Sequence, residues 1–210
     1  MEIAEIIDSI REVIEEDDMI REKALPLTRD AVRKCSKSIK STHRGEYDKA
    51  RKFLDEADVM IKEAQKQLTQ SQFLSKTKIL NTAYQELSEA ANFLSLITKG
   101  EFVQPDEFDI PGRPYMTGLA DTVGELRRAV LDTLRDNELE KSERYLQLME
   151  EIFDELHTLD FPNALIPDLR RKCDVARGII ERTRGDITST ITQERLIEKL
   201  RSFEKRFENE

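Results

Sequence analysis

Four carboxylates in two short stretches are the residues whose types and spacing point most directly to chemistry. Glu86 and Glu89 are three residues apart, and Asp121 and Glu125 are four apart, in segments with helical apolar periodicity. At about 100° per residue, the members of each pair share a face. Glu86 falls in an apolar sector, where an uncompensated charge costs desolvation free energy. A bound cation or acid–base catalysis would explain that placement, and an exposed acid pair on a solvated face is the alternative.

The two acid pairs would converge if their helices pack antiparallel. Ligands that are all oxygen suit Mg²⁺ or Mn²⁺, which prefer carboxylates and water. Such a site serves phosphoryl chemistry, because the metal activates water and stabilises the charge that develops on phosphate oxygens. No phosphate-binding glycine loop competes with this interpretation, and two histidines and two distant cysteines cannot form a zinc site of standard spacing.

Two glycines, Gly118 and Gly124, lie in the helical segment that carries Asp121 and Glu125. Each costs about 1 kcal/mol inside a helix relative to alanine. Close approach of another backbone or of a ligand would justify them, and we expect such an approach at both positions.

The composition indicates an all-α protein with long charged helices. Charged residues make up 37% of the 210 residues and aromatic residues 6%, with no tryptophan. No apolar run approaches the roughly 20 residues of a membrane span, and the acidic N-terminus has no apolar core of signal length. Cys35 and Cys173 are expected to be reduced packing residues of a cytoplasmic protein.

Apolar periodicity predicts seven helices and no long strand. The one long linker, residues 101–114, contains three prolines, with Phe102 and Phe108 as expected anchors. The third helix is apolar on two sides, which predicts subunit interfaces. The expected helices span about residues 3–43, 46–68, 71–98, 114–135, 139–158, 167–184 and 192–207.

A basic face on the first helix stands out because the net charge of the chain is −9. Arg29, Arg33, Lys37 and Lys40 are three or four residues apart and share that face. Such a face meets a phosphate backbone or an acidic partner surface, and a solvated face is the alternative. Nucleic acid is therefore expected to bind only at a local basic patch.

The whole chain resembles the translin and translin-associated factor X family. Gln85-Glu86-Leu87-Ser88-Glu89-Ala90 resembles the factor X motif with two catalytic glutamates, and residues 118–126 resemble its segment with the catalytic aspartate. Further short stretches that resemble translin or factor X are residues 5–7, 18–22, 27–30, 43–44 and 168–174.

The resemblance implies one domain over residues 1–210, a seven-helix translin-like bundle and assembly into a hollow octameric shell. It also implies a Mg²⁺-dependent endoribonuclease that cleaves short single-stranded RNA, or a strand of a small RNA duplex, inside that shell. Glu86, Glu89 and Asp121 match the catalytic acids of factor X, and Glu125 matches a further acid that would join them as a metal ligand.

The resemblance also implies RNA-binding arginines. Arg21 matches a position that contacts RNA in translin, and Arg128 matches a basic residue beside the factor X acids. The basic face of the first helix, with Arg21, Arg29 and Arg33, would guide RNA, and Arg128 would help to neutralise the phosphate. Because the chain mixes features of both subunits, it is expected to form a homo-octamer of one ancestral-type subunit. The alternatives are a non-catalytic translin-like shell that binds RNA or DNA, and a helical scaffold that binds an acidic protein.

Overall fold

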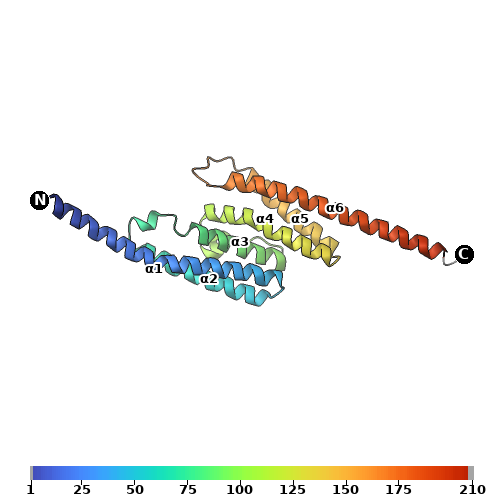
Figure 1. The fold of residues 1–210 in the computed structure, drawn as a ribbon, viewed down its shortest axis with the longest axis horizontal. Coiled ribbons are helices and arrows are strands. Elements are labelled where there is room, and N and C mark those ends of the chain that lie inside the picture. Colours follow the sequence, from blue (N-terminus) through green and yellow to red (C-terminus); the bar gives the residue numbers. More distant parts are fainter. Residues whose placement is uncertain (1, 208–210) are drawn as a thin grey trace. The chain divides into compact units, whose positions relative to one another are not determined.

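The computed structural model describes the backbone of residues 2–207 and the side chains up to Glu204. This part of the chain has six α-helices, two short 3₁₀ helices and no strand, which confirms the all-α prediction (Figure 1). By its contacts the chain divides into two compact units, one ending at Leu119 and the other beginning at Ala120, so α4 contributes to both. The elements are α1 (Ile3–His43), α2 (Tyr47–Leu68), η1 (Leu74–Lys76), α3 (Asn81–Thr98), η2 (Pro105–Phe108), α4 (Gly112–Arg135), α5 (Leu139–His157) and α6 (Leu169–Phe207).

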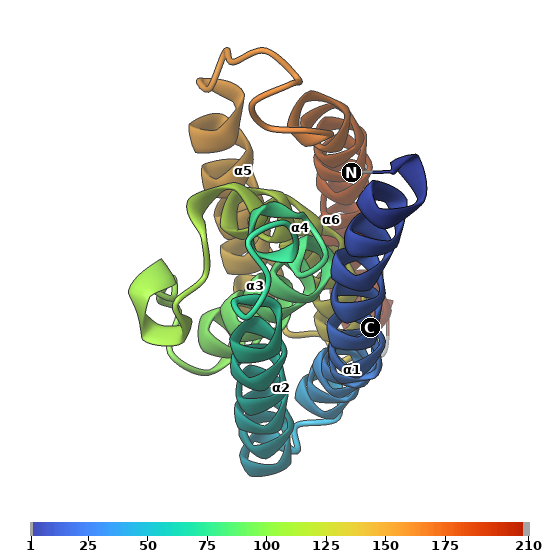
Figure 2. The same ribbon diagram turned by 90° about the vertical axis from the view of Figure 1, so that its left-hand side faces the viewer.

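In the first unit, α1 and α2 pack side by side (Figure 2), and each contributes a narrow strip of small buried residues. Alanines recur every seven residues along both helices, which is nearly two turns and keeps them on one face. Ser38 continues the α1 strip, and its Oγ donates a hydrogen bond to the carbonyl of Ala50 at 2.9 Å. Gly45, at φ +72°, provides the left-handed turn between the helices. The fully buried alanines of this strip are Ala24, Ala31, Ala50, Ala57 and Ala64.

The helix α3 packs against both α1 and α2 and carries the centre of the first unit's core. Leu87 and Phe93 are completely buried, and so is the amide side chain of Asn92. Asn92 accepts a hydrogen bond from the Val103 amide at 3.1 Å, while its Nδ2 donates to the Ser88 carbonyl at 2.9 Å. This buried amide therefore ties the linker after α3 to the helix itself.

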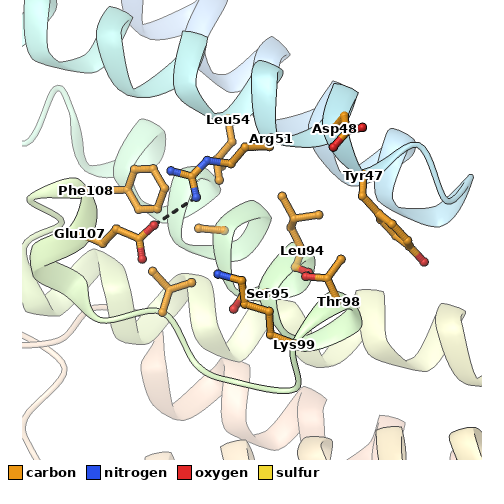
Figure 3. A pocket seen from close by; sticks show the side chains of 12 residues that line it. Tyr47, Asp48, Arg51, Leu54, Leu94, Ser95, Thr98, Lys99, Glu107 and Phe108 are labelled. Carbon is orange, nitrogen blue, oxygen red and sulfur yellow. Dashed lines mark hydrogen bonds and ion pairs between the residues drawn. The ribbon is translucent and has the colours of Figure 1, made fainter.

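The linker is fixed to α2 at Arg51, beside a cavity of about 420 Å³ (Figure 3). The Arg51 guanidinium lies 5.3 Å from the centre of the Phe108 ring and 3.2 Å from the Glu107 carboxylate. Phe108 is buried, which confirms it as an anchor, and Phe102 is half-buried. The cavity contains none of the residues predicted to do chemistry.

The second unit consists of the later turns of α4 together with α5 and α6. Arg127 of α4 donates to Thr183 at 2.8 Å and to the carboxylate of Asp186 at 2.7 Å, both on α6. Thr133 and Ser142 share a buried hydrogen bond of 2.8 Å between α4 and α5. The most deeply buried apolar side chains of the second unit are Val123, Leu126, Val130, Met149 and Ile152.

Two predicted boundaries are wrong. The expected sixth and seventh helices are one continuous helix, α6, so the described residues form six α-helices rather than seven. Gly185 lies within α6 and does not adopt the positive φ of a glycine that ends a helix. The third helix begins at Asn81 rather than near Ser71, because the Ser71 Oγ accepts hydrogen bonds from the amides of Phe73 and Leu74 and caps a separate short turn.

Candidate active site

The first turns of α4 lie against α3 at the level of the glutamate pair. A Cβ added at Gly118 would lie 2.3 Å from the Gln85 carbonyl oxygen and 2.7 Å from the Ser88 Cβ. The Ser88 Oγ also donates to the Tyr115 carbonyl at 2.9 Å. The backbones therefore approach as closely as the sequence predicted for Gly118. At Gly124 an added Cβ would meet no described atom within 4 Å, so the expected approach of another backbone is wrong there and only the approach of a ligand stays a prediction.

Glu86 and Glu89 are both half-buried, and the charges of both affect the Cys35 thiol of α1. Burial raises the pKa of the Cys35 thiol, and the negative charges of Glu86 and Glu89 raise it further. Because charge effects of this kind need proximity, the two carboxylates lie near the same turn of α1. Their half-burial disagrees with an exposed acid pair on a solvated face. Cys35 itself is buried and forms no disulfide, as predicted for a packing residue.

A shallow groove between α1 and the start of α3 brings two of the predicted arginines to the same side of the unit. Arg29 and Arg33 line it from α1, and Thr82 and Ala83 line it from α3. Glu86 follows one turn after Thr82 on α3. In the first unit, Arg29 and Arg33 therefore line a groove whose α3 wall lies one turn before Glu86.

The other predicted basic residues lie outside this groove. Arg21 is exposed further toward the start of α1, where it pairs with Glu22 at 2.9 Å and with Asp18 at 3.6 Å. Arg128 is exposed on the part of α4 in the second unit. Arg29, Arg33, Lys37 and Lys40 are all exposed, as expected for a basic face.

In the second unit, Asp121 is held by a lysine that sequence reasoning did not identify. Lys172 Nζ lies 2.5 Å from Oδ1 and 2.6 Å from Oδ2 of Asp121, and both side chains are largely buried. Glu125, one turn further on α4, is half-buried. Lys172 is in the stretch 168–174 that carries the family resemblance, which is the only signal that could have drawn attention to it.

The donor chemistry at these positions fits a hard divalent cation, since all four ligands would be carboxylates. Among the described residues, however, no group of three or more histidine, cysteine, aspartate or glutamate side chains is gathered to hold a metal ion. Glu86 and Glu89 belong to the first unit, and Asp121 and Glu125 to the second. That the two pairs share one ion stays a prediction.

Comparison with known proteins decides the family. The model of the translin family matches residues 4–183. The chain belongs to the translin family. An uncharacterised protein of Methanocaldococcus jannaschii, MJ0175, is 34% identical over 186 residues, which are 88% of this chain and 82% of that protein.

Solved structures agree with this translin-family assignment. The crystal structure of AfC3PO has a TM-score of 0.81 at 32% identity, covering 89% of this chain and 97% of its own. AfC3PO in complex with duplex RNA has a TM-score of 0.80 at 33% identity, with the same coverage. Apo-NeC3PO, at 21% identity, covers 88% of this chain and 96% of its own with a TM-score of 0.78, and shows the fold alone. No helix in the described range is long and apolar enough to cross a membrane.

Proposed function

We propose that this translin-family protein is a Mg²⁺-dependent endoribonuclease acting on single-stranded RNA or on one strand of a small RNA duplex. The observation that carries the proposal is the half-buried pair Glu86 and Glu89 beside the groove of Arg29 and Arg33. The similarity to AfC3PO, which has been solved with duplex RNA, supports RNA as the ligand.

The chain's own groups would divide the work as follows. Glu86, Glu89 and Asp121, with Glu125, would hold Mg²⁺ or Mn²⁺, and the ion would supply Lewis acidity for phosphodiester hydrolysis. Arg29 and Arg33 would bind backbone phosphates on the α1 side, since one guanidinium group can donate two parallel hydrogen bonds to a phosphate.

Two further arginines would extend the contact with RNA. Arg128 would neutralise charge on the reacting phosphate, and Arg21 would bind RNA further along α1. The net charge of −9 leaves RNA binding to these local patches, so affinity should fall steeply as salt rises. Each phosphate contact contributes about 0.7 to the slope of log K against log salt for a single strand.

An oligomer, expected to be an octamer, is part of the proposal because α1 exposes an apolar stripe. The N-terminal turns of α1 extend past α2 in Figure 1, and side chains there include Ile3 at 76% exposure and Ile14 at 61%. A stripe of this kind on a helix end marks a protein interface. Its exposed members are Ile3, Ile6, Ile7, Ile10, Val13 and Ile14, and the end of α6 similarly exposes Leu196, Ile197, Leu200 and Phe203.

The second candidate is a shell that binds RNA without cleaving it. The observation that favours it is the Asp121–Lys172 ion pair, in which the lysine occupies both carboxylate oxygens. In that case the carboxylates would stabilise the fold and the basic groove alone would bind RNA.

The experiment that separates the two uses 5′-labelled single-stranded RNA with Mg²⁺ or with EDTA, and measures binding by fluorescence anisotropy beside cleavage. The endoribonuclease proposal expects internal cleavage with Mg²⁺, none with EDTA, and recovery when Mg²⁺ is restored. Tight binding without cleavage under any metal condition would leave the binding shell.

A further inference from the structure

The groove between α1 and the first turn of α3 is open, largely apolar and large enough for one small organic group. Its volume is about 540 Å³, within the range of small-ligand sites. Leu25 and Val32 of α1, Ile79 of the turn before α3 and Ala83 of α3 give it apolar walls. These four side chains are half-buried or buried, so they form a firm surface rather than mobile tips.

The charged side chains that line the groove are positive. Arg29 and Arg33 line it, and no acidic side chain does. Arg33 pairs with Asp30 at 2.7 Å, but both side chains are well exposed and neighbours on one helix, so the pair is weak and can yield to a phosphate. An apolar slot beside two guanidinium groups suits a nucleotide, whose base is flat and whose phosphates are anionic.

The start of α3 adds a polar side chain to one wall. Thr82 lines the groove with an exposed side chain on the first turn. Its hydroxyl can donate or accept a hydrogen bond at the edge of a base.

The spacing between the groove and Glu86 along α3 is comparable to the length of one or two nucleotides. Glu86 follows Thr82 by four residues, which is about 6 Å along the helix axis. A stacked strand advances about 3.4 Å per nucleotide, and an unstacked strand advances further. A base in the groove would therefore belong to a nucleotide one or two positions from a phosphate at Glu86 and Glu89.

We propose that this groove is a subsite that holds one unstacked nucleobase of the RNA, next to the phosphate that is cleaved. The proposal rests on the proposed endoribonuclease function for its register, but base binding itself does not require cleavage. It gives the protein a reason to prefer strands with an accessible base, since a base within a regular duplex is stacked and paired.

The first test uses labelled RNAs that each carry one abasic nucleotide at a defined position. If the groove holds a base, cleavage should be suppressed at least fivefold at a single phosphodiester, one or two nucleotides from the abasic position, and remain normal elsewhere. Cleavage that is indifferent to the abasic position would overturn the subsite and leave the endoribonuclease intact.

The second test fills the groove. Thr82→Tyr places a ring in it from an exposed position, and Asn81→Tyr places the same ring on the neighbouring exposed residue, which does not line the groove. Binding of a short single-stranded RNA, measured by anisotropy in EDTA, should weaken about fivefold or more for Thr82→Tyr and hardly change for Asn81→Tyr.

These outcomes separate the two proposals. If no RNA is cleaved but Thr82→Tyr selectively weakens binding, the endoribonuclease fails and the base subsite stands. Equal affinity of the two tyrosine variants would overturn the subsite whether or not RNA is cleaved. If Thr82→Tyr instead abolishes binding of an acidic peptide but not of RNA, the groove is a protein-docking site and the proposal is wrong.

Discussion

The contact at Gly118 gives a prediction that compares two glycines of the same helix. Both Gly118→Ala and Gly124→Ala gain up to about 1 kcal/mol of helix propensity. At Gly118 the new Cβ would lie 2.3 Å from the Gln85 carbonyl oxygen, whereas at Gly124 it would meet no described atom within 4 Å. The two substitutions are chemically identical, so a difference in stability measures the packing of α4 against α3.

The magnitude follows from what must move. The nearest atom at Gly118 belongs to the α3 backbone and cannot rotate away, and overpacking of this kind costs about 1–3 kcal/mol. After subtraction of the propensity gain of about 1 kcal/mol, Gly118→Ala should lose up to about 2 kcal/mol of stability. Gly124→Ala should gain about 0.5–1 kcal/mol. For a chain of this length each kcal/mol shifts Tm by roughly 2–4 °C.

The assay is urea and thermal unfolding followed by circular dichroism at 222 nm, at one fixed protein concentration, because assembly also changes apparent stability. We expect the melting temperature of Gly118→Ala to fall below that of the wild type and that of Gly124→Ala to rise above it. A Gly118→Ala protein as stable as Gly124→Ala would refute the close approach of the two helices.

Three further predictions concern charge and assembly. Because burial and the charges of Glu86 and Glu89 raise the pKa of the Cys35 thiol, only the unfolded chain loses this proton at moderately alkaline pH. The free energy of unfolding of the wild type should then fall by about 1.4 kcal/mol per pH unit above roughly pH 8.5, relative to that of Cys35→Ala. Urea unfolding of both proteins at a series of pH values measures this, and two unfolding midpoints that change with pH in the same way would contradict it. If Asp121 must give up its ion pair with Lys172 to bind the metal ion, Lys172→Met should lower the Mg²⁺ concentration for half-maximal cleavage severalfold. A higher Mg²⁺ concentration for half-maximal cleavage would show that the lysine supports the metal site. Ile10→Glu, in the exposed stripe of α1, should shift the sedimentation velocity profile toward smaller species, whereas the exposed control Arg11→Glu should leave it unchanged. The same profile for both variants would remove the stripe from the interface.

Local signals in the sequence predicted much of the first unit. The spacing of isoleucines and alanines predicted α1 with its observed bounds, Ile3 to His43. The helix ends predicted near residues 43 and 98 are confirmed, and Gly45 and Gly100 just beyond them have positive φ, which glycine adopts at no steric cost. Glycine is unfavourable inside a helix, so Gly118 predicted that another backbone or a ligand lies close to it, and in the structure that backbone is α3.

The errors came from features that depend on tertiary context. The sequence predicted a helix that ends at residue 184, just before Gly185, and another that begins at residue 192. In the structure α6 runs through this segment, where the hydroxyls of Thr188, Thr190 and Thr192 each donate to a carbonyl one turn back. The Asp121–Lys172 pair joins residues 51 positions apart, and no periodicity links them.

The measurement that tests the central claim most directly is the Mg²⁺ dependence of RNA cleavage by Glu89→Gln. The matched control is Glu101→Gln, an exposed glutamate in the linker after α3, and RNA binding is measured in EDTA to keep affinity out of the comparison. We expect Glu89→Gln to bind RNA as the wild type does but to lose cleavage by a factor of at least about 100, because mutation of even an outer-shell partner of a metal costs about 10–100-fold, while Glu101→Gln retains cleavage. Equal Mg²⁺-dependent cleavage by both variants would contradict the account and exclude the glutamate pair from the active site.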